Sequence, residues 1–381
     1  MERNGFENAE VQLHRDGYLI DGCIFISEEN LIERFEAVNN TPKKGGENLQ
    51  TTVNNLVNYT TSTPRTVTFK FHSSVPLSTS EIFWRDAIRE AMIEWSNVKN
   101  FALTFEETLS SNPEITFYGA NLGGAVAEAS WPSSGDPGSR ITVNTSYNTT
   151  FSLNQLKFVM AHEIGHTLGF RHTNWEQDGE SINNPATGMY GANLVSGTWN
   201  DDPYSIMNSG KYYPYVPTWN GFGFLDILAF RTIYPLDGNQ KPFYVYRRLT
   251  NKGYYWTNDW SEYGNYTYES STSTGYEYIG YNGFIYDTQI SGTVPIYLYY
   301  SPGSDWYYKS KDPTIDTAFP GWNKIKIIGY AFASGGTGRQ PVYEFYNPSK
   351  GFFFTLNSDN NLTSGPNWSN SGVAFYVNSI E

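Results

Sequence analysis

Three of the five histidines in the chain lie within one short stretch, from His162 to His172. The stretch reads His-Glu-Ile-Gly-His-Thr-Leu-Gly-Phe-Arg-His. Residues four apart share one face of a helix, so His162 and His166 can direct both imidazoles at one ion. Gly169 permits a sharp turn with a positive φ, which brings His172 back as a third ligand. Three neutral imidazoles leave one tetrahedral position open, and an open position is typical of a catalytic zinc site.

Glu163 is placed to act on water at such a site. It follows His162 directly, so on a helix it points one step round and reaches a metal-bound water rather than the metal. Zinc lowers the pKa of a bound water from about 15.7 to about 7, and Glu163 can then accept the proton as general base. The alternative is that the histidines are ordinary surface or core residues, since a bare His-Glu-x-x-His arises by chance. The added glycine and third histidine favour one catalytic Zn²⁺.

The complete run from His162 to His172 resembles the signature of the metzincin zinc endopeptidases. Metzincins also carry a methionine turn beneath the metal, and Tyr204-Ser-Ile-Met207-Asn208 supplies one downstream. Within the clan, the run is most similar to the bacterial dual-action HEIGH metallopeptidases. The resemblance implies an α+β catalytic domain with a twisted sheet, an active-site helix and a Met-turn. It also implies a zinc metalloendopeptidase that acts on protein or peptide substrates, with Met207 as a platform rather than a ligand.

The sequence divides into three parts of different character. Residues 1–64 are interpreted as a pro-segment and exposed connector, because 39–65 are rich in Asn, Thr, Gly and Lys with almost no apolar periodicity. Residues 65–238 mix strand and helix patterns, as an α+β protease domain requires. Strands are expected at 66–72, 103–106, 115–118, 125–130 and 141–143; helices are expected from Ser80, from Ser152 with Gln155 completing a capping box, and over 224–234.

Residues 239–381 form the third part and contain a repeated aromatic pattern. Pro-x-Tyr-x-Tyr or Pro-x-Tyr-x-Phe opens at Pro242, Pro295 and Pro341, and each unit continues to an aromatic pair. Three all-β units of roughly 45 residues predict a β-trefoil, since one unit alone cannot bury its apolar face. Exposed Tyr and Trp rings stack well on sugars, so glycan or cell-surface binding is one interpretation. The other is structural, because aromatics at period two are commonly core residues and cross-strand pairs.

Cys23 is the only cysteine of the chain, so no internal disulfide can form. Metzincins are commonly made as zymogens in which a pro-segment ligand occupies the open zinc position. A thiolate is a strong zinc ligand, and we expect Cys23 to hold this position until cleavage within 39–65 removes it. Asp21 is the second candidate ligand. The alternative is that Cys23 is a small buried hydrophobe.

The resemblance also implies a strand that aligns an extended peptide through backbone hydrogen bonds. Gly124, Ala125, Val126 and Ala127 lie in the matching place before the active-site helix. Pairing of a peptide with an unpaired strand edge is β-augmentation, which suits a protein substrate. The alternative interpretation is an ordinary short strand of small residues.

Composition narrows the range of partners and places. The formal net charge of −13 argues against nucleic acid, which clustered Lys and Arg would bind. No run approaches the roughly 18 apolar residues of a membrane span. We expect a secreted monomer whose signal peptide is not present in this chain. Asp-Gly loops are candidate sites for Ca²⁺, although no EF-hand spacing occurs. The rival function is a glycan- or cell-surface-binding adhesin with a non-catalytic metal site, which would not need Glu163.

Overall fold

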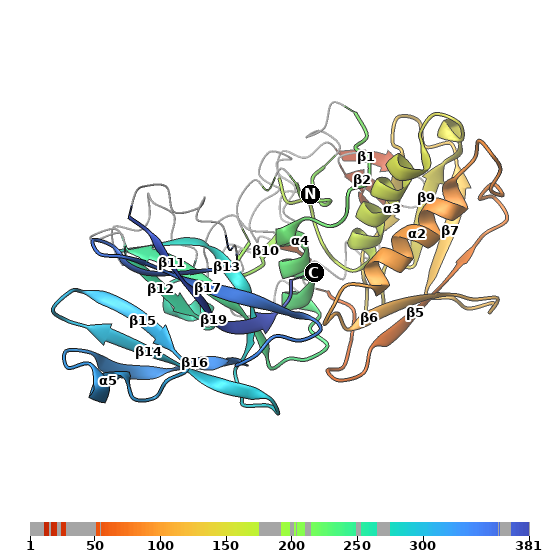
Figure 1. The fold of residues 1–381 in the computed structure, drawn as a ribbon. Helices are drawn as coiled ribbons and strands as arrows, with labels where there is room; N and C mark the ends of the chain where they lie inside the picture. The colour runs from red at the N-terminus through yellow and green to blue at the C-terminus, as the bar shows by residue number, and fades with distance from the viewer. Residues whose placement is uncertain are drawn as a thin grey trace, which may run out of the picture. The chain divides into compact units, whose positions relative to one another are not determined.

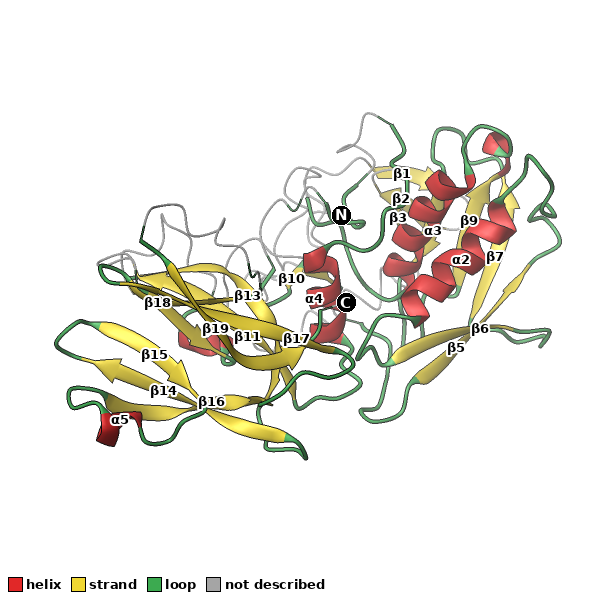
Figure 2. Ribbon diagram, viewed as in Figure 1, coloured by secondary structure: helices red, strands yellow, loops and turns green. Residues whose placement is uncertain are grey.

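The computed structural model divides the 381-residue chain into two compact units, Met1–Leu236 and Asp237–Glu381. Figures 1 and 2 show the elements of each unit. Before residue 51, the structure describes the backbone of three short strands. The other described residues are 51–53, 55–174, 192–198, 202, 204–209, 215–248, 253–264, 275–356, 358 and 367–380.

The first unit is built on an eight-stranded mixed sheet with the order β1-β2-β3-β8-β9-β7-β5-β6. β9, β7, β5 and β6 run parallel to one another, whereas β8 is antiparallel to β9 and parallel to β3. A separate short sheet pairs β4 with β10. The bounds are β1 Val11–His14, β2 Gly17–Ile20, β3 Ile24–Ser27, β4 Thr51–Thr52, β5 Arg65–Phe71, β6 Leu103–Glu107, β7 Ile115–Ala120, β8 Ala127–Ser130, β9 Arg140–Asn144 and β10 Asn193–Leu194. The strands predicted between residues 66 and 143 are therefore confirmed, with small shifts at their ends.

Two long helices, α2 Trp84–Ser96 and α3 Leu153–Thr167, pack side by side and contact the sheet (Figure 1). α2 begins later than the predicted Ser80 because a turn precedes it, closed by the Thr79 N–H, which donates to the carbonyl of Ile82 at 3.0 Å. α3 begins as predicted, with the capping box of Ser152 formed. The shorter α4 covers Phe224–Ile233. Among the described residues, no helix is long and apolar enough to cross a membrane.

Aromatic side chains join the helices of the first unit. The ring centroid of Trp95, on α2, lies 4.2 Å from that of Phe230 on α4 and 6.1 Å from that of Phe170. The Trp95 indole N–H donates to the carbonyl of Ala161 on α3 at 3.0 Å, which satisfies its one polar atom inside the core. Burial of these large rings fixes α2, α3 and α4 around the stretch that follows α3.

The prediction of an exposed connector is wrong for the part around residues 52–57, whereas residues 60–64 are exposed as expected. Thr52, Val53 and Val57 are buried, with at most 3 % of their surface exposed. β4 pairs with β10, and the backbone N–H of Asn58 donates to the carbonyl of Gly135 at 2.8 Å. Pairing with distant segments holds this polar stretch against the unit, and composition does not reveal such pairing.

The second unit repeats one three-stranded antiparallel motif three times within a nine-stranded sheet. The strands are β11 Gln240–Arg248, β12 Tyr254–Thr257, β13 Tyr276–Tyr286, β14 Thr293–Ser301, β15 Trp306–Ser310, β16 Asn323–Phe332, β17 Arg339–Asn347, β18 Gly351–Thr355 and β19 Ser369–Asn378. The long strands β13, β16 and β19 are joined pairwise by single residue pairs, Tyr286 with Tyr330, Phe332 with Tyr376 and Phe284 with Asn378. The threefold repetition follows the aromatic pattern, while the β-trefoil stays a prediction.

Equivalent residues of the three repeats meet inside the second unit. Trp256, Lys309 and Phe354 each directly precede the residue that pairs with the central Tyr of the Pro-x-Tyr pattern. Nζ of Lys309 lies over the ring of Trp256 and 4.2 Å from the ring centroid of Phe354. Lys309 is fully buried, and Nζ has no hydrogen-bond partner in the part of the chain that the structure describes. Burial lowers the pKa of Lys309 well below its ordinary value, although the nearby Glu344 raises it.

Candidate metal centre

The histidines of the 162–172 run converge at the C-terminal end of α3. The ring centroids of His162 and His166 are 4.5 Å apart, and that of His172 lies 5.4 and 5.0 Å from them. One ligand nitrogen from each ring lies within 4.8 Å of the other two, and all three side chains are buried. Three imidazoles in this arrangement can hold one divalent ion. No other His, Cys, Asp or Glu group of the described ranges forms such a cluster.

Backbone carbonyls orient two of the rings. Nδ1 of His162 donates to the carbonyl of Ile206 at 2.6 Å, and Nδ1 of His166 donates to that of Phe170 at 2.8 Å. A carbonyl only accepts, so Nδ1 carries the proton and the lone pair of each ring is on Nε2, the atom that would bind a metal. Burial, together with His162 and His172, lowers the pKa of His166 well below its ordinary value. The ring is therefore neutral, as a ligand must be.

A glycine turn brings the third histidine back to the helix. Gly169 has a φ of +98°, the positive value predicted from the sequence. The Gly169 N–H donates to the carbonyl of His166, and the Phe170 N–H donates to that of Gly165, both at 3.0 Å. These bonds close the end of the helix in the manner of a glycine C-cap. The chain reverses there, which places the ring of His172 beside those of His162 and His166.

Met207 packs against α3 at Gly165, which lies between the two helical histidines in the sequence. It is buried, and a Cβ added at Gly165 would overlap its Sδ atom. The absence of a side chain at Gly165 is therefore what lets the thioether lie against the helix. The N–H of Thr173 donates to the carbonyl of Met207 at 2.9 Å, which ties the residue after His172 to the same turn. The structure thus places the predicted Met-turn residue beside the histidine cluster.

A buried carboxylate that the sequence analysis missed holds the methionine turn. Asp226, on α4, accepts hydrogen bonds from Ser205 Oγ at 2.6 Å, from the N–H of Ile206 at 3.0 Å and from that of Gly223 at 2.9 Å. Because Ile206 also accepts from His162, one residue separates α4 from a candidate metal ligand. Burial raises the pKa of Asp226 to about 6, against the lowering effect of the three hydrogen bonds. Its only sequence signal is an acidic residue in the first turn of the predicted 224–234 helix.

Glu163 is buried next to the histidines, and its Oε2 atom has no hydrogen-bond partner among the described residues. Burial raises the pKa of Glu163 well above its ordinary value; His172 lowers it, and Glu128 on β8 raises it further. The raised pKa makes this carboxylate a stronger base, and the charge of a bound divalent ion would lower the pKa again. Glu128, itself buried, is a second carboxylate that the sequence analysis missed. The sequence feature that marks Glu128 is its single charge within a strand of small residues.

Of the four residues predicted to align a peptide, only Ala127 lies within β8. Gly124, Ala125 and Val126 precede the strand, and Asn144 on β9 binds this stretch. The Asn144 N–H donates to the carbonyl of Val126 at 3.0 Å, and its Nδ2 donates to that of Ala125 at 2.6 Å. These bonds hold the predicted peptide-binding residues against β9.

The other edge of β8 is paired with the N-terminal strand β3. Ile24 and Phe25 are the partners of Ala129 and Ser130, in parallel register. β8 therefore has a strand neighbour on each side at Ala129. The two predicted blocking ligands lie outside the described residues: Cys23 and Asp21.

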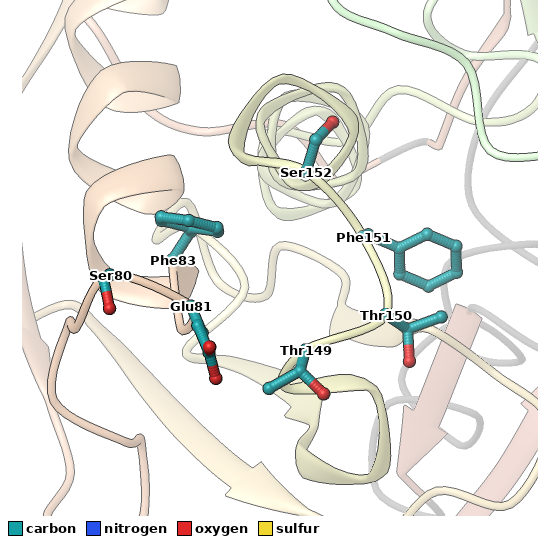
Figure 3. A pocket seen from close by; sticks show the side chains of 7 residues that line it. All are labelled: Ser80, Glu81, Phe83, Thr149, Thr150, Phe151 and Ser152. Atoms are coloured by element: carbon teal, nitrogen blue, oxygen red, sulfur yellow. The ribbon is translucent and has the colours of Figure 1, made fainter.

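An open hollow near the start of α3 is separate from the histidine cluster (Figure 3). Its residues come from the approach to α2 and from the loop that leads into α3, and they are Ser80, Glu81, Phe83, Thr149, Thr150, Phe151 and Ser152. Ser152 caps the helix, so His162 lies about 15 Å further along its axis. The lining offers hydroxyls, phenyl rings and one carboxylate, which make neither a set of metal ligands nor a nucleophile with its base. This hollow is not part of the candidate centre.

Two parts of the sequence match known families. Residues 25–227 match the model of the dual-action HEIGH metallo-peptidase family, and residues 306–378 match a domain of unknown function, DUF5648. None of the curated proteins matches the chain. Two solved structures of myroilysin are similar to it at 16 % sequence identity. One alignment covers 49 % of this chain and 98 % of myroilysin with a TM-score of 0.32, and the other covers 52 % and 96 % with a TM-score of 0.30.

Proposed function

Because the chain belongs to the dual-action HEIGH metallo-peptidase family, we propose that it is a zinc-dependent endopeptidase of the metzincin clan. The observation that carries this proposal is the convergence of His162, His166 and His172 with Glu163 buried beside them. The residues fit a metal, since backbone carbonyls hold two of the rings in the tautomer that ligates through Nε2. A donor set of three imidazoles suits zinc.

The proposed mechanism assigns each side chain one task. When bound, zinc supplies a Lewis acid and an acidified water as nucleophile. His162 and His166 would hold the ion through Nε2, and His172 would complete the set. Glu163 accepts the proton of the nucleophile as it attacks the peptide carbonyl, and then delivers this proton to the leaving amine. Met207 supports the site by packing under α3.

We further propose that the N-terminal part keeps the enzyme inactive. An extended substrate would pair with the edge of β8, and β3 already pairs with Ala129 and Ser130 there, which supports competition between them. Cys23 directly precedes β3 in the sequence, and we assign it the role of blocking ligand, with Asp21 as the second candidate. The test compares casein hydrolysis by the wild-type chain with that by Cys23→Ala. Equal initial rates would contradict the role of Cys23.

The remaining parts of the proposal concern the whole protein. It would be a secreted monomer, with residues 65–238 as the protease domain and 239–381 as a β-trefoil accessory domain. Partly exposed rings in the second unit, such as those of Trp306 and Trp322, support binding to glycans or to a cell surface. A glycan array probed with the full chain tests this part, and the absence of any binding would remove it.

Glu163→Gln in the Cys23→Ala background tests the enzyme itself. The amide keeps the shape of the side chain but cannot accept the proton, so casein hydrolysis should fall by at least about a hundredfold. The zinc content, measured by elemental analysis, should stay at that of the parent. His166→Ala is the matched variant that should lose the ion. A parent chain that binds no zinc would overturn the proposal, and undiminished hydrolysis by Glu163→Gln would overturn the role of Glu163.

A further inference from the structure

The stretch that was predicted to be an exposed connector lies against the turn of the histidine run. We define the 51–59 segment as residues 51–53 and 55–59. The backbone N–H of Val53 donates to the carbonyl of Gly169 at 2.8 Å. Thr52 forms an antiparallel bridge with Phe170. The segment therefore pairs with the two residues at which the chain reverses.

Side chains of the segment also fill the space beside the turn. A Cβ added at Gly169 would lie 2.9 Å from Leu56 and 3.1 Å from Val53, so these side chains pack directly on the glycine. Val53 and Val57 are each only 2 % exposed. A side chain at Gly169 would overlap Leu56 and Val53. It would also be strained by the positive φ, which glycine adopts without cost.

The hydroxyl of Tyr234 forms a second link between the segment and the turn. The N–H of Val57 donates to the hydroxyl of Tyr234 at 3.1 Å, and that hydroxyl donates to the carbonyl of Leu168. The carbonyls of Leu168 and Gly169 are thus both held by bonds that lead to the 51–59 segment. At the N-terminal end of the 51–59 segment, β4 pairs with β10.

The turn that the segment holds is also part of the metal centre. Phe170 supplies the carbonyl that accepts Nδ1 of His166, and it stands two residues before His172. A shift of this turn would rotate one ligand and displace another at the same time. Partners that orient metal ligands in this way commonly matter tenfold or more for metal affinity.

We propose that the 51–59 segment positions His166 and His172, and that it stays attached in the active enzyme, so that activating cleavage falls before Thr51. The inference rests on the proposed zinc site and deepens it. It narrows the cleavage region expected from the sequence, 39–65, to the part before residue 51. It also makes the segment a positioning element of the catalytic domain rather than part of the pro-segment.

Hydrogen exchange of the wild-type full chain tests the coupling without any substitution. The amide of Val53 should exchange faster when zinc is removed with a chelator, and slow again when zinc is restored, because the turn that accepts its hydrogen bond loosens without the metal. Peptides that cover 51–58 report this change, and a peptide within β5 serves as the control for general loosening. Equal exchange of 51–58 with and without zinc, beside a clear change at 166–172, would overturn the proposal.

A pair of variants at Val53 tests the same point through zinc affinity, measured by competition with a chromogenic chelator. Val53→Pro removes the N–H that binds Gly169, and the extended Thr52 before it tolerates a following proline. Its zinc affinity should fall about tenfold. Val53→Ala keeps the N–H and loses only side-chain packing on Gly169, so its zinc affinity should fall less than that of Val53→Pro. Equal affinities of the two folded variants would contradict the positioning role, and the exchange measurement decides the matter if Val53→Pro does not fold.

The N-terminal residue of the active form tests where the activating cleavage falls. Mass spectrometry of the chain that gains activity should find a new N-terminus before Thr51. An active form that begins after Val57 would overturn the inference. Zinc bound normally without coupling to the segment would remove only this inference, whereas a chain that binds no zinc would remove the proposed function.

Discussion

Asp226 accepts the backbone N–H of Ile206 at 3.0 Å, and this hydrogen bond connects α4 with the candidate metal centre. The carbonyl of the same Ile206 accepts Nδ1 of His162 at 2.6 Å. The peptide that orients a ligand is therefore itself fixed by a buried carboxylate. The metal centre depends in this way on a helix that contributes no ligand to it.

Replacement of this carboxylate should weaken zinc binding. Asp226→Ala leaves the N–H groups of Ile206 and Gly223 and the hydroxyl of Ser205 without the acceptor that they share, which should cost about 2–4 kcal/mol of unfolding free energy. Zinc affinity should fall about tenfold, because His162 loses its fixed partner. Calorimetry and chelator competition measure the two effects. Wild-type zinc affinity in a folded Asp226→Ala chain would show that the turn does not need α4.

The ionisation of Asp226 should also affect how the stability of the chain depends on pH. Burial raises the pKa of Asp226 from 3.8 to about 6, so between these values the folded chain binds more protons than the unfolded one. Stability from this group is present at low pH and is lost as the pH rises through about 6. The stability of Asp226→Asn, which cannot ionise, should therefore improve relative to wild type between about pH 4 and pH 6, as thermal unfolding would show. A constant difference across this range would contradict the raised pKa.

A methyl group at Gly165 should disturb the centre through Met207. The Cβ of Gly165→Ala would overlap Sδ of Met207, so the turn must move or the helix must shift, at a cost of about 1–3 kcal/mol. In the Cys23→Ala background, the rate of casein hydrolysis and the unfolding temperature should both decline. Gly303→Ala is the control, because a Cβ there meets nothing within 4 Å and should change neither quantity. Unchanged hydrolysis by Gly165→Ala would argue against a supporting role for Met207.

The buried Lys309 should destabilise the second unit. Lys309→Met keeps the length of the side chain next to Trp256 and Phe354 and removes the buried amine, so the unit should gain about 1–3 kcal/mol near neutral pH.

This gain should shrink as the pH rises. The folded pKa of Lys309 is lowered, so the unfolded chain binds more protons up to the ordinary value of 10.5. Wild-type stability from this group therefore increases with pH over that window. Thermal unfolding of both chains at several pH values measures the difference. A less stable Lys309→Met chain would contradict the prediction that the buried amine destabilises the unit.

Features set by local sequence were predicted well. The capping box at Ser152 and the positive φ of Gly169 depend on a few neighbouring residues, and both are confirmed. The strands between residues 66 and 143 follow from alternation of apolar and polar residues, which reports the face that each strand buries. The position of His172 followed from the spacing of the run and the turn residue within it.

Features set by distant contacts were not predicted. The 51–59 segment has the composition of a loop, and only its pairing with Gly169 and Phe170 explains why Val53 is buried. Asp226 looks like an ordinary acidic residue in a first helical turn until its hydrogen bond to Ile206 is seen. Such contacts join residues far apart in the chain, and one sequence carries no sign of which partners will meet.

The position of β8 between β9 and β3 has a kinetic consequence for the proposed enzyme. A peptide that must pair with the edge held by β3 cannot bind until that strand leaves. Departure is an event within one chain, so its rate does not depend on how much peptide is present. Progress curves of the uncleaved Cys23→Ala protein should then begin with a lag whose length stays the same when the peptide concentration is doubled.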